Sequence, residues 1–276
     1  MEACIKNHPQ YGRICWLTDG KTEIGVALDF GIRVVHLSCA GTENLYYAQP
    51  GDLSDGFGTA DTWKLRGGHR MWLSPEGEHS YYPDDDPVCV ETIPDGIIVE
   101  QKTDPWQNMV KTLKIVYQPD GTIRFDHNFR NVGDSPFRAA SWGVNTMAGY
   151  GTAEIGFSGQ GGFTPTRTVS LWGNTNLHDS RIRFTSDGIT ATHAPSPDYF
   201  KIGVYSRDGV AVFRNKGQQL TLRYEAPPMD ELPDGGCNFE LYMGEKFMEL
   251  EVLGAVKEIL PGESVGHTEL LTLSPL

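Results

Sequence analysis

Short runs of β-branched and aromatic residues recur along the whole chain, roughly every 8 to 15 residues, between clusters of Gly, Asp, Asn and Pro. This spacing predicts many short β strands. The predicted strands are Arg13–Thr18, Thr22–Asp29, Ile32–Ser38, Val88–Ile93, Val110–Gln118, Thr122–Arg130, Arg181–Thr185, Tyr199–Ser206, Val210–Arg214, Leu220–Glu225, Cys237–Met243, Lys246–Leu253 and His267–Leu273.

The connections between these runs predict hairpins. Asp-Gly pairs follow or precede several of the runs, as at Asp19-Gly20, Asp120-Gly121 and Asp208-Gly209, and tight hairpin turns favour this pair because it tolerates positive φ. No long segment has the apolar periodicity of an amphipathic helix. We therefore predict an all-β fold, a sandwich of large antiparallel sheets in a single domain over residues 1–276. Residues 50–87 differ in composition and predict a long, functional excursion between strands.

Composition narrows the class of partner. The 276 residues carry 23 Lys and Arg against 36 Asp and Glu, a net charge of −13, which disfavours nucleic acid and anionic membranes as partners. The chain has no apolar run long enough for a transmembrane helix, and its first residues do not resemble a signal peptide. Five widely spaced cysteines predict reduced thiols in a cytoplasmic protein. We expect one cooperative folding unit that needs neither a disulfide nor a metal.

The segment Arg66–Glu76 combines groups that suit a sugar ligand. Two glycines precede His69, Arg70 and Trp72, and Glu76 follows. A Trp ring can cover the apolar face of a sugar, while Arg, His and Glu can hydrogen bond to its hydroxyls. The simpler alternative is a surface loop in which Arg70 and Glu76 form an ordinary ion pair.

Lys201 lies on a predicted strand at a position that leaves space around it. Strand alternation places Lys201 and Gly203 on one face and Phe200, Ile202 and Val204 on the other, which we expect to be core. A ligand-binding lysine beside a small residue is one interpretation. A solvated lysine is the other.

Two carboxylates alternate with apolar residues near the C-terminus. Met248, Leu250 and Val252 predict a core face, so Glu249 and Glu251 project together from the opposite face. Like charges at this spacing raise each other's pKa, which favours a role as acid or base. The alternative is a solvated polar strand face.

Several segments, taken in order, resemble the galactose mutarotase-like superfamily, which includes the aldose 1-epimerases. They are Gly31–Leu37, Gly41–Tyr46, Gly67–Trp72, Phe200–Gly203, Pro233–Gly236, Glu249–Gly254 and Leu260–Ser264. The resemblance covers nearly the whole chain and is greatest to a bacterial family of about this size. It implies a β-supersandwich with an open, concave ligand cleft, and a carbohydrate as the ligand.

The resemblance also implies chemistry. In mutarotases a His protonates the ring oxygen and a Glu removes the proton of the anomeric hydroxyl, so the ring opens and closes on either face. The base carries over to Glu249 or Glu251. The acid does not carry over directly, because the segment Ala140–Asn145 lacks the usual Asn-His pair; His69 is the best substitute and His178 the next.

These observations predict a carbohydrate-active protein that binds a mono- or oligosaccharide, with aldose 1-epimerase-type acid–base catalysis. The alternatives are a non-catalytic sugar-binding module and a glycoside hydrolase or lyase that uses paired carboxylates. The expected catalytic residues are His69, Glu249 and Glu251, with a sugar ring held between His69 and one of the glutamates. The expected sugar contacts are Arg70, Trp72, Glu76, Lys201, Asp234, Glu240 and His178.

No cofactor and no metal are expected. Gly159–Gly162 does not open a helix, which argues against a dinucleotide loop. The triplet Asp84–Asp86 could bind Ca²⁺, but a solvated acidic loop is the simpler interpretation.

Overall fold

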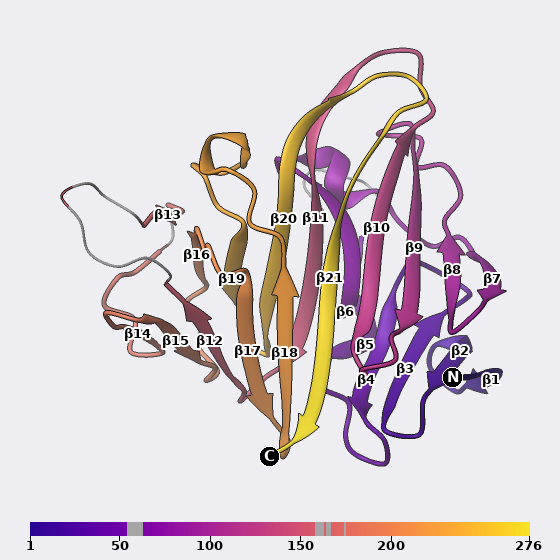
Figure 1. Cartoon of the computed structure of the whole chain (residues 1–276), viewed down its shortest axis with the longest axis horizontal. Coiled ribbons are helices and arrows are strands. Elements are labelled where there is room, and N and C mark those ends of the chain that lie inside the picture. The colour runs from indigo at the N-terminus through magenta and orange to yellow at the C-terminus, as the bar shows by residue number, and fades with distance from the viewer. Residues whose placement is uncertain (54–62, 158–162, 164–166, 174) are drawn as a thin grey trace.

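The computed structural model describes residues 1–53, 63–157, 163, 167–173 and 175–276, and for residues 50–53 it describes the backbone alone. These residues form two large antiparallel β sheets with two short 3₁₀ helices, Glu78–Tyr81 and Met229–Glu231 (Figure 1). The predicted all-β sandwich is confirmed. Gly159–Gly162 and part of the 50–87 excursion lie outside the described residues.

The first sheet has eleven strands in the order β1-β2-β3-β4-β6-β11-β20-β19-β16-β13, with β5 paired to β6. They are β1 (Glu2–His8), β2 (Gly12–Thr18), β3 (Thr22–Ala27), β4 (Val34–Cys39), β5 (Ala48–Leu53), β6 (Lys64–Ser74), β11 (Phe137–Ala148), β13 (Val169–Leu171), β16 (Phe200–Val204), β19 (Phe239–Met243) and β20 (Phe247–Ile259).

The second sheet has ten strands in the order β14-β15-β12-β17-β18-β21-β10-β9-β8-β7. They are β7 (Cys89–Ile93), β8 (Gly96–Glu100), β9 (Met109–Tyr117), β10 (Ile123–Asn131), β12 (Thr152–Gly156), β14 (Ile182–Phe184), β15 (Gly188–Thr192), β17 (Val210–Asn215), β18 (Gln218–Tyr224) and β21 (Ser264–Pro275).

The core lies between the sheets and follows from strand alternation. Met71 and Leu250 of the first sheet belong to the same buried apolar cluster as Leu113, Phe125 and Phe129 of the second sheet. Residues that alternate with Met71 and Leu250 therefore point to the other face of the first sheet. That face carries the candidate site.

Two central strands of the first sheet were not predicted. β6 lies inside the segment expected to be an excursion, and the expectation of a loop over 66–76 is wrong. β11 pairs with β6 on one side and with β20 on the other, although Ala139, Ala140 and Gly143 give it little β-branched character.

The glycine pair in β6 serves strand packing. Gly67 and Gly68 have φ of 70° and 69°, and a Cβ on either would lie 1.9 Å from the Tyr47 carbonyl oxygen or 2.3 Å from that of Val34. No side chain fits there, so the pair lets backbone approach backbone. Our expectation that these glycines approach a ligand is not supported by their contacts.

The acidic triplet Asp84–Asp86 is neutralised by basic side chains. The ion pairs are Asp84–Arg33 at 3.0 Å, Asp84–Arg66 at 3.6 Å, Asp85–Lys64 at 3.3 Å, Asp85–Arg66 and Asp86–Lys102 at 2.9 Å. Arg33 is fully buried, and burial lowers its pKa to about 10. The carboxylates that a calcium ion would need are therefore already paired with basic side chains.

We expect the chain to unfold in one cooperative thermal transition that dithiothreitol leaves unchanged. All five cysteines are free thiols, and one buried apolar cluster contains residues of both sheets. Calorimetry with and without reductant checks this. Two separated transitions, or a melting temperature that falls in reductant, would contradict it.

Candidate functional site

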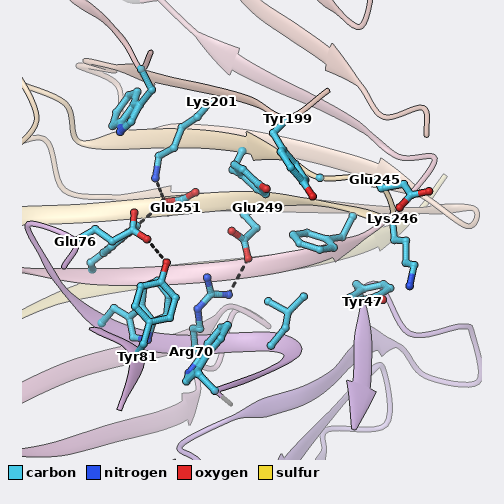
Figure 2. A pocket seen from close by; sticks show the side chains of 18 residues that line it. Tyr47, Arg70, Glu76, Tyr81, Tyr199, Lys201, Glu245, Lys246, Glu249 and Glu251 are labelled. Carbon is cyan, nitrogen blue, oxygen red and sulfur yellow. Dashed lines mark hydrogen bonds and ion pairs between the residues drawn. The ribbon is translucent and has the colours of Figure 1, made fainter. Parts of the chain in front are cut away.

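A pocket with a volume of about 550 Å³ lies on the face of the first sheet that points away from the core (Figure 2). Its floor comes from β6, β11, β16, β19 and β20, and its walls come from neighbouring loops. The lining residues are Tyr47, Trp63, Leu65, Arg70, Trp72, Glu76, Tyr81, Trp142, Trp172, Tyr199, Lys201, Tyr242, Gly244, Glu245, Lys246, Phe247, Glu249 and Glu251.

Aromatic rings form much of this surface. Trp72 packs against Trp63, Tyr81 and Trp142, with ring centroids 5.2 to 5.3 Å apart. Farther along the pocket, Tyr242 stacks on Tyr199 with centroids 6.0 Å apart. The tryptophan cluster is buried and fixes the shape of the pocket, whereas the more exposed rings of Tyr199 and Tyr242 offer apolar faces to a ligand.

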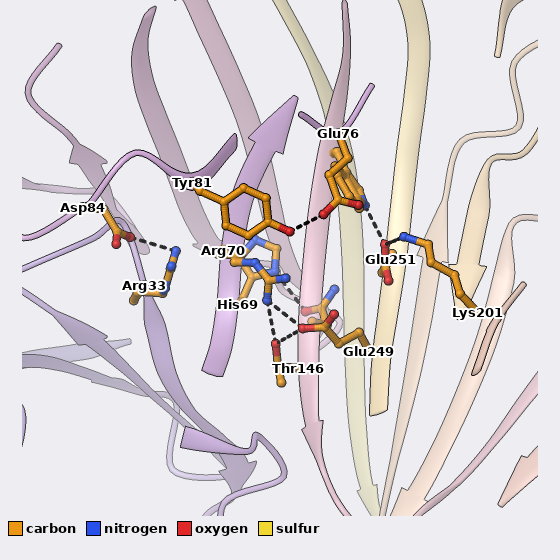
Figure 3. Close-up of polar contacts among 12 residues, drawn as sticks. Arg33, His69, Arg70, Glu76, Tyr81, Asp84, Thr146, Lys201, Glu249 and Glu251 are labelled. Atoms are coloured by element: carbon orange, nitrogen blue, oxygen red, sulfur yellow. Dashed lines mark hydrogen bonds and ion pairs between the residues drawn. The ribbon is translucent and has the colours of Figure 1, made fainter. Parts of the chain in front are cut away.

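One ion pair crosses the floor from β6 to β20. Arg70 Nη1 donates to Glu249 Oε1 at 2.7 Å and to Thr146 Oγ1 at 2.9 Å, and Thr146 Oγ1 donates to the same carboxylate at 2.8 Å (Figure 3). The guanidinium lies over the Trp72 ring at 4.2 Å. Three contacts thus fix Arg70 and leave its Nε without a partner.

A second charged group lies farther along β20. Lys201 Nζ contacts Glu251 Oε2 at 3.2 Å and Glu240 Oε2 at 2.8 Å. Trp142 Nε1 donates to Glu251 Oε2 at 3.0 Å, and the ammonium also lies 4.9 and 5.0 Å from the centroids of the Trp142 and Trp172 rings. One ammonium is therefore shared by two buried carboxylates.

Burial shifts the proton affinities of this group. Burial raises the pKa of Glu251, although Lys201 opposes the shift, and raises the pKa of Glu240 well above its ordinary value. Burial acts against the charge on Lys201, but Glu251 and Glu240 outweigh it and raise the lysine pKa. The lysine thus stays charged, while burial favours the protonated form of each carboxylate.

The predicted positions of Lys201, Glu249 and Glu251 agree with the structure. Phe200, Ile202 and Val204 are core residues of β16 and Lys201 points away from them. Both glutamates line the pocket, as strand alternation predicted. The solvated alternatives do not apply, because Lys201, Glu249 and Glu251 are all buried.

His69 does not lie in the pocket, so the expectation of a histidine facing a glutamate across a sugar is wrong. Its side chain is fully buried between the sheets and bonds to Asn145 and His127. The reason is strand alternation: His69 and Arg70 are adjacent on β6 and point to opposite faces. Among the described residues, no histidine lines the pocket.

Of the four other predicted contacts, only Glu76 lines the pocket, and Glu240, Asp234 and His178 lie elsewhere. Glu76 lines the pocket but bonds to the Tyr81 hydroxyl and not to Arg70. Glu240 lies buried behind Lys201. Asp234 accepts a hydrogen bond from Ser74 and lines a smaller neighbouring pocket. His178 is exposed on a turn outside the pocket.

Most pocket aromatics were missed in the sequence. Trp142 lies on β11, which itself was not predicted, and Trp172 comes to Lys201 because Gly203 leaves room for its ring. Tyr242 could have been predicted from the sequence, because it shares a strand face with Glu240.

We expect Trp72→Ala to lower the free energy of unfolding by about 3–5 kcal/mol, because a buried aromatic side chain leaves a cavity. Trp72 is only 5 % exposed and touches three other aromatic rings. Denaturant unfolding measures the change. Trp106→Ala is the control, since Trp106 is 44 % exposed, and should cost much less. Equal effects of the two substitutions would contradict the packing role of Trp72.

Comparison with known proteins identifies the fold. No protein-family model and no curated protein matches the sequence. A proposed aldose 1-epimerase from Escherichia coli K12 superposes with a TM-score of 0.61 at 13% identity, over 95% of this chain and 99% of that one. A galactose mutarotase-like protein from Lactobacillus casei gives 0.59 at 10% identity, over 95% and 100%. A galactose mutarotase-related enzyme from Lactobacillus acidophilus gives 0.58 at 8% identity, over 95% and 97%.

The described residues contain no helix long and apolar enough to cross a membrane. The sequence identities are low, so the likeness concerns the course of the backbone. The two sheets of the sandwich match over nearly the full length of this chain and of its neighbours. The chain therefore has the galactose mutarotase-like fold.

Proposed function

We propose that the pocket binds a carbohydrate and that Glu251 and Glu249 carry out acid–base chemistry at its anomeric carbon. The observation that carries this proposal is the combination of aromatic walls with two ion-paired carboxylates on one floor strand. The proposal takes its ligand class from this chemistry and from the mutarotase-like fold.

The chemistry of the lining favours a sugar. A pyranose ring has apolar C–H faces, which stack on the more exposed rings of the lining, such as Trp172 and Tyr242, and a rim of hydroxyls, which exchange hydrogen bonds with charged groups. The volume of about 550 Å³ lies within the range of about 300–1,000 Å³ that small-molecule sites occupy.

The spacing of the two glutamates along β20 suits the two oxygens on the anomeric carbon of a sugar. Residues i and i+2 of a strand are separated by about 7 Å along it, so both carboxylates can form hydrogen bonds of about 2.7 Å to two oxygens that share one carbon. A sugar edge lying along β20 would place its ring oxygen at one carboxylate and its anomeric hydroxyl at the other.

In the proposed reaction, one glutamate donates a proton and the other accepts one. Glu251 gives its proton to the ring oxygen as the C1–O bond breaks, and Glu249 takes the proton of the anomeric hydroxyl, which becomes the aldehyde oxygen. After rotation about the C1–C2 bond, the reverse transfers close the ring on the other face. Glu251 replaces His69 as the acid in this scheme.

Anomer-exchange NMR tests the catalytic proposal. When the α-anomer signal of a reducing sugar is saturated, the saturation should transfer to the β-anomer signal faster with the protein than without it. Glucose, galactose and reducing disaccharides are suitable probes. If no sugar that binds shows faster exchange, the catalytic part fails.

One observation favours a second candidate, a non-catalytic sugar-binding protein. Both floor carboxylates are already held in ion pairs, which suits fixed hydrogen-bond acceptors as well as catalysts. Binding without faster exchange and without release of a reducing sugar from oligosaccharides would support this candidate.

A further inference from the structure

Three histidines and a glutamate lie together in the interior between the two sheets, away from the pocket. His69 comes from β6 of the first sheet, and His127, His267 and Glu269 come from β10 and β21 of the second. All four side chains are almost fully buried. Such a cluster is rare in an apolar core because unpaired polar groups are costly there.

The ring nitrogens closest to each other face across a short gap. His69 Nε2 lies 2.8 Å from His127 Nε2, and His127 Nε2 lies 3.8 Å from Glu269 Oε1. One ligand atom from each of these three residues lies within 4.8 Å of the others. The three atoms thus form one compact group of ligand atoms from both sheets.

The outer nitrogens of both rings are hydrogen-bond donors. His69 Nδ1 lies 3.0 Å from Asn145 Oδ1, and His127 Nδ1 lies 3.3 Å from the main-chain oxygen of His267. Asn145 Oδ1 also accepts from the Tyr46 hydroxyl, while its amide nitrogen donates to Glu269. Both partners are acceptors, so each Nδ1 carries the hydrogen.

Two lone pairs therefore point at each other across the 2.8 Å gap. If each Nδ1 carries the ring's hydrogen, each neutral ring has a bare Nε2. A positive charge between the nitrogens removes this repulsion.

The surroundings have the organisation that metal ligands require. A ligating histidine nearly always donates its other N–H to a carbonyl or carboxylate, as both rings do here. His267 Nε2 lies 3.2 Å from Glu269 Oε1 and orients the carboxylate. Gly143 makes room for it, because a Cβ there would lie 2.0 Å from Glu269 Oε1.

We propose that His69, His127 and Glu269 bind a divalent transition-metal ion, with Zn²⁺ as the best fit, that links the two sheets. Imidazole and carboxylate ligands suit Zn²⁺, with bonds of about 2.0–2.2 Å. Neighbouring ligand atoms in a tetrahedral site of that size are about 3.3 Å apart. The observed separations of 2.8 and 3.8 Å lie on either side of this value.

This ion would not contact a molecule bound in the pocket. It would affect the pocket only through the strands that separate the two. His69 precedes Arg70 on β6, and Asn145 precedes Thr146 on β11, so the interior groups lie directly beneath the Arg70–Glu249 contact. The inference departs from the sequence-based expectation of a metal-free chain. It does not depend on the proposed sugar chemistry.

Metal analysis of the full-length protein tests the proposal. Tag-free protein is incubated with Zn²⁺, passed over a chelating resin and analysed by inductively coupled plasma mass spectrometry. We expect one zinc per chain, a melting temperature that falls when a strong chelator removes it and recovers on re-addition, and the visible absorption of tetrahedral Co²⁺ after exchange. The proposal would be overturned if the protein contains no zinc and neither chelator nor Zn²⁺ changes its melting temperature. A proton shared by the two rings would then be the explanation for the short distance between their nitrogens.

Variants locate the ion. Glu269→Gln and His127→Asn should lose the zinc, whereas His193→Asn, which alters a buried histidine bonded to the Gly244 carbonyl, should retain it. Zinc retained in both cluster variants would place the ion elsewhere and contradict the assignment. If the cluster variants fail to fold, the chelator and Co²⁺ measurements on the wild-type protein still decide the question.

Discussion

Glu251→Gln is expected to slow protein-catalysed anomer exchange by roughly 10²–10⁴-fold, the usual contribution of a positioned acid or base. Glutamine keeps the shape of the side chain and its contact with Trp142, but it has no proton to transfer to the ring oxygen. Saturation-transfer NMR with a reducing sugar measures the rate. Glu258→Gln on the exposed part of the same strand is the control and should retain the wild-type rate.

The pH dependence gives a second signature of the same residue. Burial raises the pKa of Glu251, so the donating, protonated form persists to higher pH than for an ordinary glutamate. The wild-type rate should fall as pH rises through this raised pKa, and the decline should be missing from the residual activity of Glu251→Gln. A Gln variant with the wild-type rate and pH profile would contradict the role of Glu251 as the acid.

Lys201→Met is expected to lower the free energy of unfolding by about 3–5 kcal/mol, because it leaves buried charge without a partner. Lys201 contacts Glu240 and Glu251, whose side chains are each only 1% exposed. Urea unfolding at neutral pH measures the loss, and it should be smaller at low pH, where both carboxylates are protonated.

Matched variants separate charge from packing at this position. Lys114→Met removes an exposed lysine from strand β9 and should change stability little. The double variant Lys201→Met with Glu240→Gln should recover part of the loss, because one uncompensated carboxylate is gone. A Lys201→Met protein as stable as the wild type would show that the buried charges do not depend on this lysine.

The strands that sequence reasoning found are rich in β-branched and aromatic residues, but β8 and β15 have the same character, follow Asp-Gly pairs and were not among the predicted strands. Every run from Arg13–Thr18 to His267–Leu273 corresponds to an observed strand, with ends that differ by a few residues. β6 and β11 were not predicted because Gly67, Gly68 and Gly143 give them the composition of loops. Tertiary contacts decide their conformation: both lie in the middle of a sheet, where two partner strands fix the backbone.

The site was predictable wherever alternation within one strand decided the geometry. Glu249, Glu251 and Lys201 were placed correctly because their apolar neighbours marked the core face. His69 was placed wrongly because its segment was taken as a loop, where adjacent side chains can converge. Once Lys64–Ser74 is a strand, the same alternation that puts Arg70 and Trp72 in the pocket puts His69 in the interior.

The pocket's identity as a carbohydrate site is tested most directly by titrating sugars while observing tryptophan fluorescence. Four of the six tryptophans, Trp63, Trp72, Trp142 and Trp172, line the pocket, so a sugar that stacks there must change their emission. We predict a saturable change with at least one sugar in a panel of reducing mono- and disaccharides, and weaker binding after Glu249→Gln. Emission unchanged by every sugar, or an affinity that Glu249→Gln leaves untouched, would contradict carbohydrate binding in this pocket.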